Sequence, residues 1–169
     1  LNPVIIQRDV DESYPDNIGA LDVAAYVTRK KAEAYLSELE DHDVLITGDT
    51  VVVFENRVYE KPINPKEAKK MLLSLSGKTH TVVSGIAVTT KAQGIRLEVD
   101  TSEVTFTSLT ENLIDHYLTH YKPFDKAGSY GVQDLMGFIG VESINGSYFT
   151  VMGLPTLQLF RLLQKTTTG

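Results

Sequence analysis

The chain has 169 residues, 42% of them hydrophobic and 22% charged, with a net charge of −6. This composition predicts one soluble domain that buries a sizeable core. The absence of cysteine excludes disulfides, thiolate nucleophiles and cysteine-based zinc sites. There is no basic run and no apolar run of membrane-spanning length. We therefore expect no nucleic-acid polymer and no membrane as partner, and the predicted location is cytoplasmic.

The N-terminal stretch combines an apolar run with a cluster of carboxylates. Val4-Ile5-Ile6 predicts a strand over residues 3–10. Asp9, Asp11 and Glu12 follow closely. Because such carboxylates repel one another, they are a candidate cation site. A solvated acidic turn is the alternative, and the residues alone favour it.

The next segment predicts one long amphipathic helix over residues 21–39. At 100° per residue, Lys31 falls inside its apolar stripe, whereas Arg29 and Lys30 fall outside it. A lysine in an apolar stripe either extends along the surface to water or pairs with an anion. Both interpretations of Lys31 remain open at this stage.

Two apolar runs, Val44–Ile46 and Val51–Phe54, predict the central strands, separated by a break at Gly48 and Asp49. Gly48 removes a side chain where the backbone bends or where something approaches closely. A carboxylate between two buried runs is costly unless it is paired, hydrogen-bonded or bound to a metal. A local turn made by Asp49 and Thr50 is the simpler alternative.

A hairpin follows these runs. Glu55-Asn56-Arg57 predicts its turn, and Pro62 ends the returning strand because proline has no donor for a ladder. The hairpin would bring Asp49 and Lys61 to the same end of one sheet. That geometry suits phosphate chemistry and a structural ion pair equally well.

The following part of the chain alternates helices with strands. Asn64 and Thr110 are N-cap residues that predict two helix starts. Two long alternating segments between these helices predict a hairpin in the outer part of the sheet, and His80 on it is assigned no role. The predicted elements are a helix at 65–75, strands at 80–88 and 95–106, and a helix at 111–120.

The segment Pro123–Gln133 contains glycines, a serine and an amide directly after a helix. This composition favours a loop whose backbone shapes a pocket. The amide of Gln133 offers both a donor and an acceptor, and it could read the edge of a pyrimidine base. A glycine-rich surface loop is the alternative.

Residues 138–144 and 148–151 resemble strands, and Pro155 starts a last helix over residues 156–164. No internal repeat, low-complexity tract or linker interrupts the chain. The sequence therefore predicts a single α/β domain. Its expected fold is a mixed β-sheet with long antiparallel hairpins, flanked by helices.

Several short motifs follow one another along nearly the whole chain. They are Gly48–Val52, Glu60–Pro62, Leu75–His80, Asp125–Gln133, Ile144–Tyr148 and Val151–Pro155. In this order they resemble the Maf family, which are nucleoside triphosphate pyrophosphatases once described as septum formation inhibitors. The resemblance implies the Maf fold, with the substrate cleft at the strand ends.

Maf proteins begin with a strand and a Ser-x-Ser-Pro-Arg-Arg loop that holds phosphates. That loop does not occur in residues 1–169. The resemblance therefore implies that the chain lacks its N-terminal ~20 residues, a region that is often poorly ordered in domains.

The resemblance also implies catalytic roles. Asp49 would be the general base that activates water for attack on the α-phosphorus. Glu12 and Asp49 would hold a divalent cation, Mg²⁺ or Mn²⁺. Lys31 and Lys61 would stabilise charge on the phosphate oxygens.

Two further residues match one branch of the family. Thr50 and Gln133 stand where Maf proteins that take dTTP and UTP carry the same residues, and members that take methylated GTP differ at both places. Gly48 stands where the family has alanine, a mild departure. The expected substrate is thus a pyrimidine nucleoside triphosphate, bound by Thr50, Gln133, Lys31 and Lys61.

The leading hypothesis is hydrolysis of that triphosphate to the monophosphate and pyrophosphate, in nucleotide house-cleaning or cell-division arrest. The alternative is a nucleotide-binding regulator of septum formation without turnover. An aspartyl-phosphate phosphatase is disfavoured because that chemistry needs a second aspartate at position 51, which is valine. A homodimer is left open.

Overall fold

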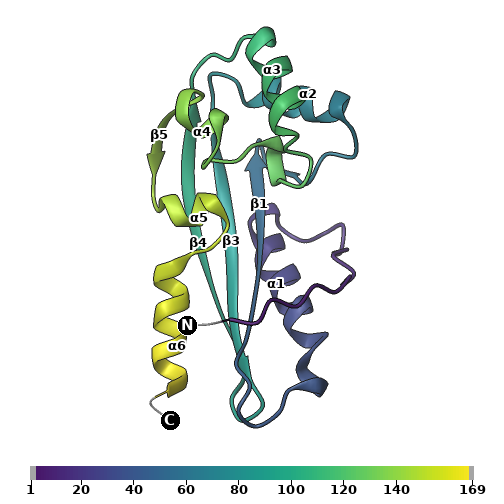
Figure 1. The fold of residues 1–169 in the computed structure, drawn as a ribbon, viewed down its shortest axis with the longest axis vertical. Helices are drawn as coiled ribbons and strands as arrows, with labels where there is room; N and C mark the ends of the chain where they lie inside the picture. The colour runs from purple at the N-terminus through teal and green to yellow at the C-terminus, as the bar shows by residue number, and fades with distance from the viewer. Residues whose placement is uncertain (1–2, 168–169) are drawn as a thin grey trace.

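The computed structural model describes residues 3–167. They form a single α/β domain built on a five-stranded sheet of order β2-β1-β3-β4-β5 (Figure 1). The strands are β1 (Leu45–Phe54), β2 (Arg57–Tyr59), β3 (Thr79–Thr90), β4 (Gly94–Phe106) and β5 (Val141–Asn145). Every pair of neighbours is antiparallel. The prediction of a mixed sheet was therefore wrong in this detail.

Helices cover both faces of this sheet. The α-helices are α1 (Val23–Glu33), α2 (Pro65–Leu75), α3 (Glu111–Tyr121), α4 (Leu135–Ile139), α5 (Tyr148–Met152) and α6 (Thr156–Thr167). Short 3₁₀ turns lie at η1 (Ala20–Asp22), η2 (Leu36–Glu38) and η3 (Ala127–Ser129). No helix in the described range is long and apolar enough to cross a membrane.

Side chains alternate along β1 and β3, so each strand serves two separate cores. Val51, Val53 and Val83 point to one face, where they pack with residues of α1. Val52 and Val82 point to the other face and join the larger core under α2 and α3. Figure 1 shows α1 to one side of the long strands and α5 and α6 to the other.

The local signals at turns and helix starts were confirmed. Glu55 and Asn56 both adopt positive φ, 50° and 60°, as a two-residue hairpin turn requires. The Asn64 side chain accepts a hydrogen bond from the Glu67 N–H at the start of α2. Thr110 caps α3 in the same way. These interactions depend on residues close in sequence, which is why the sequence predicts them well.

The predicted break in β1 does not exist. Gly48 and Asp49 pair with Ile86 and Gly85 in an uninterrupted register from Leu45 to Val53. A Cβ on Gly48 would lie 3.0 Å from the Gly85 carbonyl oxygen, so glycine here permits close strand packing rather than a bend. The alternative of a local turn at Asp49 was therefore wrong too.

Three other predictions of secondary structure need correction. Residues 3–10 form no strand, and Val4 stays 87% exposed because no strand lies beside it. The predicted helix over 21–39 is divided into η1, α1 and η2. β3 lies at the centre of the sheet, between β1 and β4, rather than in its outer part.

The predicted strands near the C-terminus were only partly correct. Within residues 138–144, β5 forms, but Phe138 and Ile139 end helix α4. Residues 148–151 belong to helix α5 despite their β-branched and aromatic side chains. Thr150 of this helix is fully buried against the sheet, and such tertiary burial outweighs intrinsic strand propensity.

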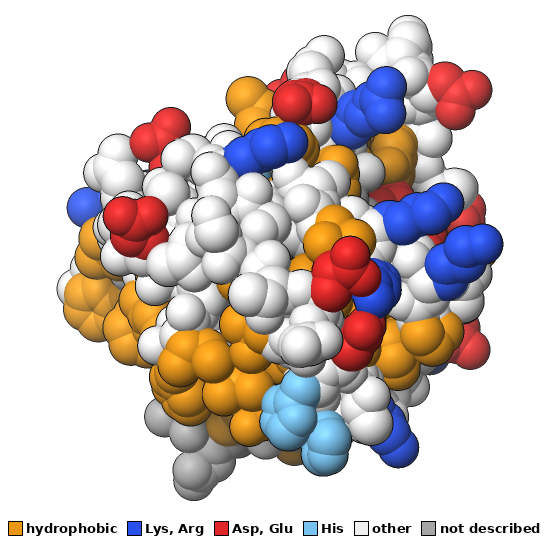
Figure 2. Space-filling view, turned by 90° about the horizontal axis from the view of Figure 1, so that it is seen from above, with side chains coloured by type: hydrophobic (Ala, Val, Ile, Leu, Met, Phe, Trp, Pro, Cys, Tyr) orange, Lys and Arg blue, Asp and Glu red, His pale blue; other side chains and the backbone are white. Residues whose placement is uncertain are grey.

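The end of the molecule that carries α2 and α3 is seen from above in Figure 2. Lysine, arginine and carboxylate side chains lie interspersed there, and hydrophobic side chains gather toward one side. One ion pair on this end joins Lys69 of α2 to Asp115 of α3 at 2.8 Å. The described residues of this face therefore form no continuous basic field for a polyanion.

His80 is buried beside Tyr130, with 2.7 Å between His80 Nε2 and the tyrosine hydroxyl. Burial lowers the pKa of His80 from 6.5 to about 4. The unfolded chain takes up a proton as the pH falls through 6.5, but the folded protein does not until about 4. The free energy of unfolding should therefore drop by about 3 kcal/mol between pH 7 and pH 4 through this group alone.

Urea denaturation at several pH values checks this prediction. His80→Gln should remove most of that slope, whereas His42→Gln, at an exposed side chain, should keep it. Equal slopes in the wild type and in His80→Gln would contradict it.

Candidate active site

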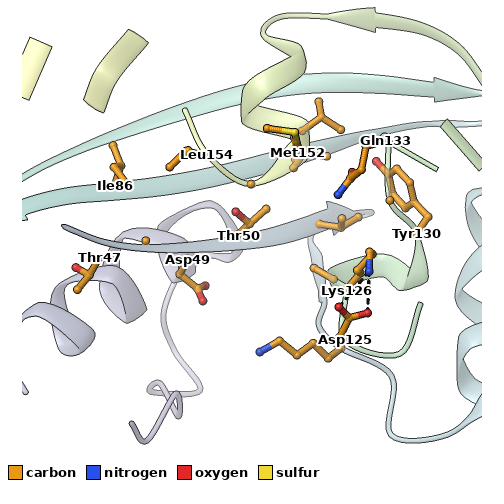
Figure 3. A pocket seen from close by; sticks show the side chains of 18 of the residues that line it. Thr47, Asp49, Thr50, Ile86, Asp125, Lys126, Tyr130, Gln133, Met152 and Leu154 are labelled. Carbon is orange, nitrogen blue, oxygen red and sulfur yellow. Dashed lines mark hydrogen bonds and ion pairs between the residues drawn. The ribbon is translucent and has the colours of Figure 1, made fainter. Parts of the chain in front are cut away.

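The central feature of the site is the unpaired part of β1. β2 pairs only with Val52, Val53 and Phe54, so among the described residues no strand lies beside the earlier part of β1 on that edge. A cavity of about 460 Å³ opens there. Its walls come from β1, from β3, from the loop over residues 125–133 and from residues 151–154 (Figure 3).

Consecutive side chains of β1 point to opposite faces of the sheet at this open edge. Asp49 and Thr50 are neighbours in a continuous strand, so their side chains point to opposite faces of the sheet. Figure 3 shows Asp49 on one side of the β1 ribbon and Thr50 on the other, where Gln133, Met152 and Leu154 also lie. A ligand that contacts both residues must therefore cross the strand edge.

On the Asp49 side, one ammonium group joins two carboxylates. Lys31 Nζ lies 2.8 Å from Asp49 Oδ1 and 2.8 Å from Glu12 Oε1. Glu12 also approaches Lys61, at 3.4 Å. Of the two interpretations of Lys31 that the sequence left open, the structure shows pairing with anions. Glu12 comes from the otherwise irregular N-terminal segment, Lys31 from α1 and Asp49 from β1.

Burial shifts the pKa values of the carboxylates in this cluster. The Asp49 side chain is 13% exposed and that of Lys31 20%. Burial raises the pKa of Asp49 above its ordinary value, although Lys31 opposes that shift. Burial opposes ionisation of Glu12 as well, but Lys31 and Lys61 outweigh it and lower the pKa of Glu12. Because burial prevails at Asp49 and the two lysines prevail at Glu12, Asp49 is the more basic of the two carboxylates.

Lys31 is the best stabilised charge of the cluster. Burial alone would lower the pKa of its ammonium, but hydrogen bonds from Lys31 to Asp49 and Glu12 raise it overall. The ammonium lines neither the main cavity nor the smaller hollow beside it. Lys31 therefore lies behind the two carboxylates, whereas Lys61 lines both hollows directly.

The opposite side of β1 carries neutral hydrogen-bonding groups. Thr50 Oγ1 lies 2.7 Å from Ser84 Oγ on β3, and Ser84 donates to the Thr150 carbonyl oxygen at 2.8 Å. Gln133 lines the same cavity from the loop after η3 and is exposed to solvent. Five of the six predicted site residues thus line one cavity or the hollow beside it, and Lys31 supports them from behind.

Three residues in or beside the cavity had no role predicted from the sequence. Lys126 and Asp125 line the cavity and pair with each other at 2.8 Å. Tyr14 lies close to Asp49 and Glu60, and burial with the Glu60 hydrogen bond raises its pKa to about 12. Lys126 lies in a motif that the sequence displays, but no local pattern marks Tyr14.

The carboxylates fit a divalent cation that arrives with a phosphorylated ligand. Residues 3–167 contain no cluster of three or more histidine, cysteine, aspartate or glutamate side chains arranged to hold a metal. Glu12 and Asp49 nevertheless direct oxygens to one point, now occupied by the Lys31 ammonium. Mg²⁺ is commonly bound by one or two carboxylates with the substrate's phosphates, which matches this donor set.

A buried carboxylate, an exposed one beside it, lysines and a neutral hydrogen-bonding face around one cavity fit a phosphorylated organic molecule. Comparison with known proteins gives the family. Residues 1–166 match the family described as Maf-like protein. The chain belongs to the Maf family.

Similar proteins from several bacteria share the name "dTTP/UTP pyrophosphatase". A "dTTP/UTP pyrophosphatase" of Bacteroides fragilis (strain YCH46) is 47% identical over 157 residues, 93% of this chain and 81% of that protein. One of Parabacteroides distasonis is 46% identical, over 95% of this chain and 83% of its own length. One of Christiangramia forsetii is 40% identical, over 94% and 80%.

Removal of the Lys31 charge should lower the free energy of unfolding. Lys31→Met leaves the buried Asp49 carboxylate facing the half-buried Glu12 without a counter-charge, so it should cost about 2 kcal/mol or more in the free energy of unfolding. Adding Asp49→Asn should recover about 1 kcal/mol or more of this loss, because one of the facing charges is gone. Denaturant titration of the two single variants and the double variant measures this coupling.

Lys30→Met provides the matched control on the same helix. Lys30 pairs with Asp11, whose side chain is 71% exposed, so its loss should cost less than about 1 kcal/mol. If the Lys31 and Asp49 effects add within about 0.5 kcal/mol, the two groups are not coupled.

Proposed function

We propose that the protein hydrolyses dTTP and UTP to the nucleoside monophosphate and pyrophosphate. The observation that carries the proposal is the Asp49–Lys31–Glu12 cluster at the open edge of β1. Support also comes from membership of the Maf family and from relatives named dTTP/UTP pyrophosphatase. The site is proposed to work in the cytoplasm.

Asp49 is the proposed general base. Its Oδ1 accepts the hydrogen bond of Lys31, and no hydrogen bond from residues 3–167 reaches Oδ2. That second oxygen can accept a proton from a water molecule placed for attack on the α-phosphorus. The raised pKa of Asp49 favours this role, because a more basic carboxylate holds the proton more readily at neutral pH.

The lysines supply positive charge where the phosphates would lie. Lys61 lines both hollows, and its only ion pair within residues 3–167, to Glu12, is 3.4 Å long. A phosphate oxygen can replace Glu12 as its partner. Lys31 orients the ionised Asp49 before a ligand binds. When a cation takes the place of its ammonium between Glu12 and Asp49, the Lys31 charge becomes available to the phosphates.

A divalent cation completes the proposed site, with Glu12 and Asp49 as its protein ligands and Mg²⁺ or Mn²⁺ as candidates. When bound, such an ion would neutralise phosphate charge and help to position the attacking water. Because the pKa of Glu12 is lowered, its carboxylate is ionised and ready for this role at neutral pH.

The base is proposed to lie on the other side of β1. There Thr50 and Gln133 face a cavity whose remaining walls include Ile86, Met152 and Leu154. Apolar walls with few polar groups suit a flat heterocycle whose edge is read by hydrogen bonds. The triphosphate would then pass over the edge of β1 to reach Asp49 and Lys61.

Asp49→Asn should lower turnover of dTTP by roughly 10²–10⁴, while the fold and most of the nucleotide affinity persist. Asparagine keeps the size of aspartate but cannot take the proton from water. Glu12→Gln should act differently, because it removes a proposed metal ligand and not the base. Pyrophosphate release, measured across a Mg²⁺ titration, checks both: excess Mg²⁺ should partly rescue Glu12→Gln and should not rescue Asp49→Asn.

Asp115→Asn is the control, since this aspartate pairs with Lys69 on the surface far from the cavity. Retention of more than about a tenth of wild-type turnover by Asp49→Asn would refute its role as base. Full activity of the wild type in excess EDTA would refute the proposed cation.

Gln133→Ala should narrow the preference for dTTP over GTP by about tenfold or more, because a site that hydrogen-bonds a base edge rejects other bases by leaving polar groups unpaired. Turnover of both nucleotides by the wild type and the variant measures this change. An unchanged ratio would mean that Gln133 does not read the base. Tight dTTP binding without pyrophosphate release by the wild type would favour a nucleotide-binding regulator instead.

A further inference from the structure

Three oxygen atoms form a hydrogen-bonded chain behind the base side of the cavity. Thr50 Oγ1 is 2.7 Å from Ser84 Oγ, and Ser84 Oγ is 2.8 Å from the Thr150 carbonyl oxygen. Ser84 is fully buried between the sheet and helix α5. No solvent molecule can therefore substitute for either of its partners without rearrangement.

The number of hydrogens determines the direction of this chain. Two oxygens at such distances need a hydrogen between them, because two lone pairs would repel. The carbonyl of Thr150 has no hydrogen to offer, so Ser84 must donate to it. Since Ser84 has only one hydrogen, Thr50 must donate to Ser84.

The carbonyl at the end of the chain is itself held firmly. The Thr150 hydroxyl donates to Asp100 of β4. Its carbonyl oxygen also accepts from the Gly153 N–H. Helix α5 packs against β3 and β4, so the carbonyl is fixed relative to Ser84.

The consequence appears in the cavity. Thr50 lines it, but its only hydroxyl hydrogen points into the protein toward Ser84. What remains for a ligand is lone pairs. Thr50 therefore offers an acceptor and no donor, although threonine alone could offer either.

We infer that Ser84 is a positioning residue that sets the hydrogen-bond polarity of Thr50, and so selects bases whose pairing edge presents a ring N–H. This inference rests on the proposed function. Thymine and uracil carry a hydrogen on N3 and satisfy the Thr50 acceptor. Cytosine has a bare lone pair on N3, which would face the lone pairs of Thr50. The site thus separates two pyrimidines of nearly equal size and shape.

Accommodation of cytosine would require the Thr50 hydrogen to leave Ser84. The buried Ser84 oxygen would then lose its only donor among residues 3–167. Leaving a buried polar atom unpaired disfavours that arrangement by about tenfold or more. The discrimination therefore depends on Ser84, which lines neither the main cavity nor the smaller hollow and would not touch the nucleotide.

Ser84→Ala tests the inference. Without the serine oxygen, the Thr50 hydroxyl can rotate and donate to N3 of cytosine. The ratio of kcat/KM for UTP to that for CTP should fall by about tenfold, mainly because CTP becomes a better substrate. Thermal denaturation of the variant shows that it is folded. An unchanged ratio in a folded, active variant overturns the inference.

Ser102→Ala is the matched control. Ser102 is equally a buried serine on the sheet, and its hydroxyl donates to the Ser147 carbonyl oxygen just before α5, at 3.1 Å. Its hydroxyl bonds Ser147 rather than Thr50, and it lines neither the main cavity nor the smaller hollow. Its UTP-to-CTP ratio should stay at the wild-type value, and a fall like that of Ser84→Ala would overturn the inference in favour of a general loosening of α5.

A second measurement needs no variant. Wild-type protein should discriminate against N3-methyl-UTP, in which the donor hydrogen is replaced, by about tenfold or more relative to UTP. Equal use of UTP, N3-methyl-UTP and CTP overturns the inference even if Ser84→Ala does not fold.

The proposed function can fail separately. In that case the wild type releases no pyrophosphate from UTP, and calorimetry with UMP and CMP then tests the polarity alone. Preference for UMP that is lost in Ser84→Ala supports the inference, and equal binding of UMP and CMP overturns it.

Discussion

The site depends on one buried ion-pair cluster, in which the Lys31 ammonium lies between Asp49 and Glu12. Asp49 lies in the interior of a strand, where its carboxylate is largely removed from water, and such a charge persists only with a partner. Lys31 provides that partner from α1 and so ties the helix to the sheet. Burial raises the pKa of Asp49 despite this partner, and the neighbouring Glu12 charge adds to the shift. The same contacts therefore stabilise the strand and prepare its proposed chemistry.

A second constraint follows from the continuity of β1. Because the strand runs without interruption past Gly48, Asp49 and Thr50 must point to opposite faces of the sheet. Charged chemistry and base recognition are therefore separated by the thickness of a single strand. The short β2 leaves the edge of β1 open at that point, so a ligand can reach both sides. Each half of the site is supported by its own layer, α1 for Asp49 and α5 for Thr50.

The local elements of the fold could be predicted from the sequence because their signals lie within a few residues, whereas the roles of the site residues were predicted from the resemblance to the Maf family. The caps at Asn64 and Thr110 and the turn at Glu55 depend on neighbours a few positions away. The position of Lys31 in an apolar stripe already indicated that its ammonium either extends to water or pairs with an anion. The predictions of secondary structure that were wrong concern segments whose conformation depends on residues distant in sequence. The strand predicted at residues 3–10 found no neighbour, and residues 148–151 became helical through burial against the sheet.

The sequence by itself determined the helix caps, the hairpin turn, the family and the residue types available for phosphate and base contacts, since these follow from composition and short-range order. Only the tertiary structure decided which groups meet. Glu12, Lys31 and Asp49 are far apart in the chain and converge because α1 packs on the sheet. The direction of the Thr50 hydroxyl is likewise invisible in sequence. It follows from Ser84 and Thr150, which lie beside it only because β3 and α5 pack there. Long-range packing thus converts ambiguous side chains into groups of defined charge and polarity.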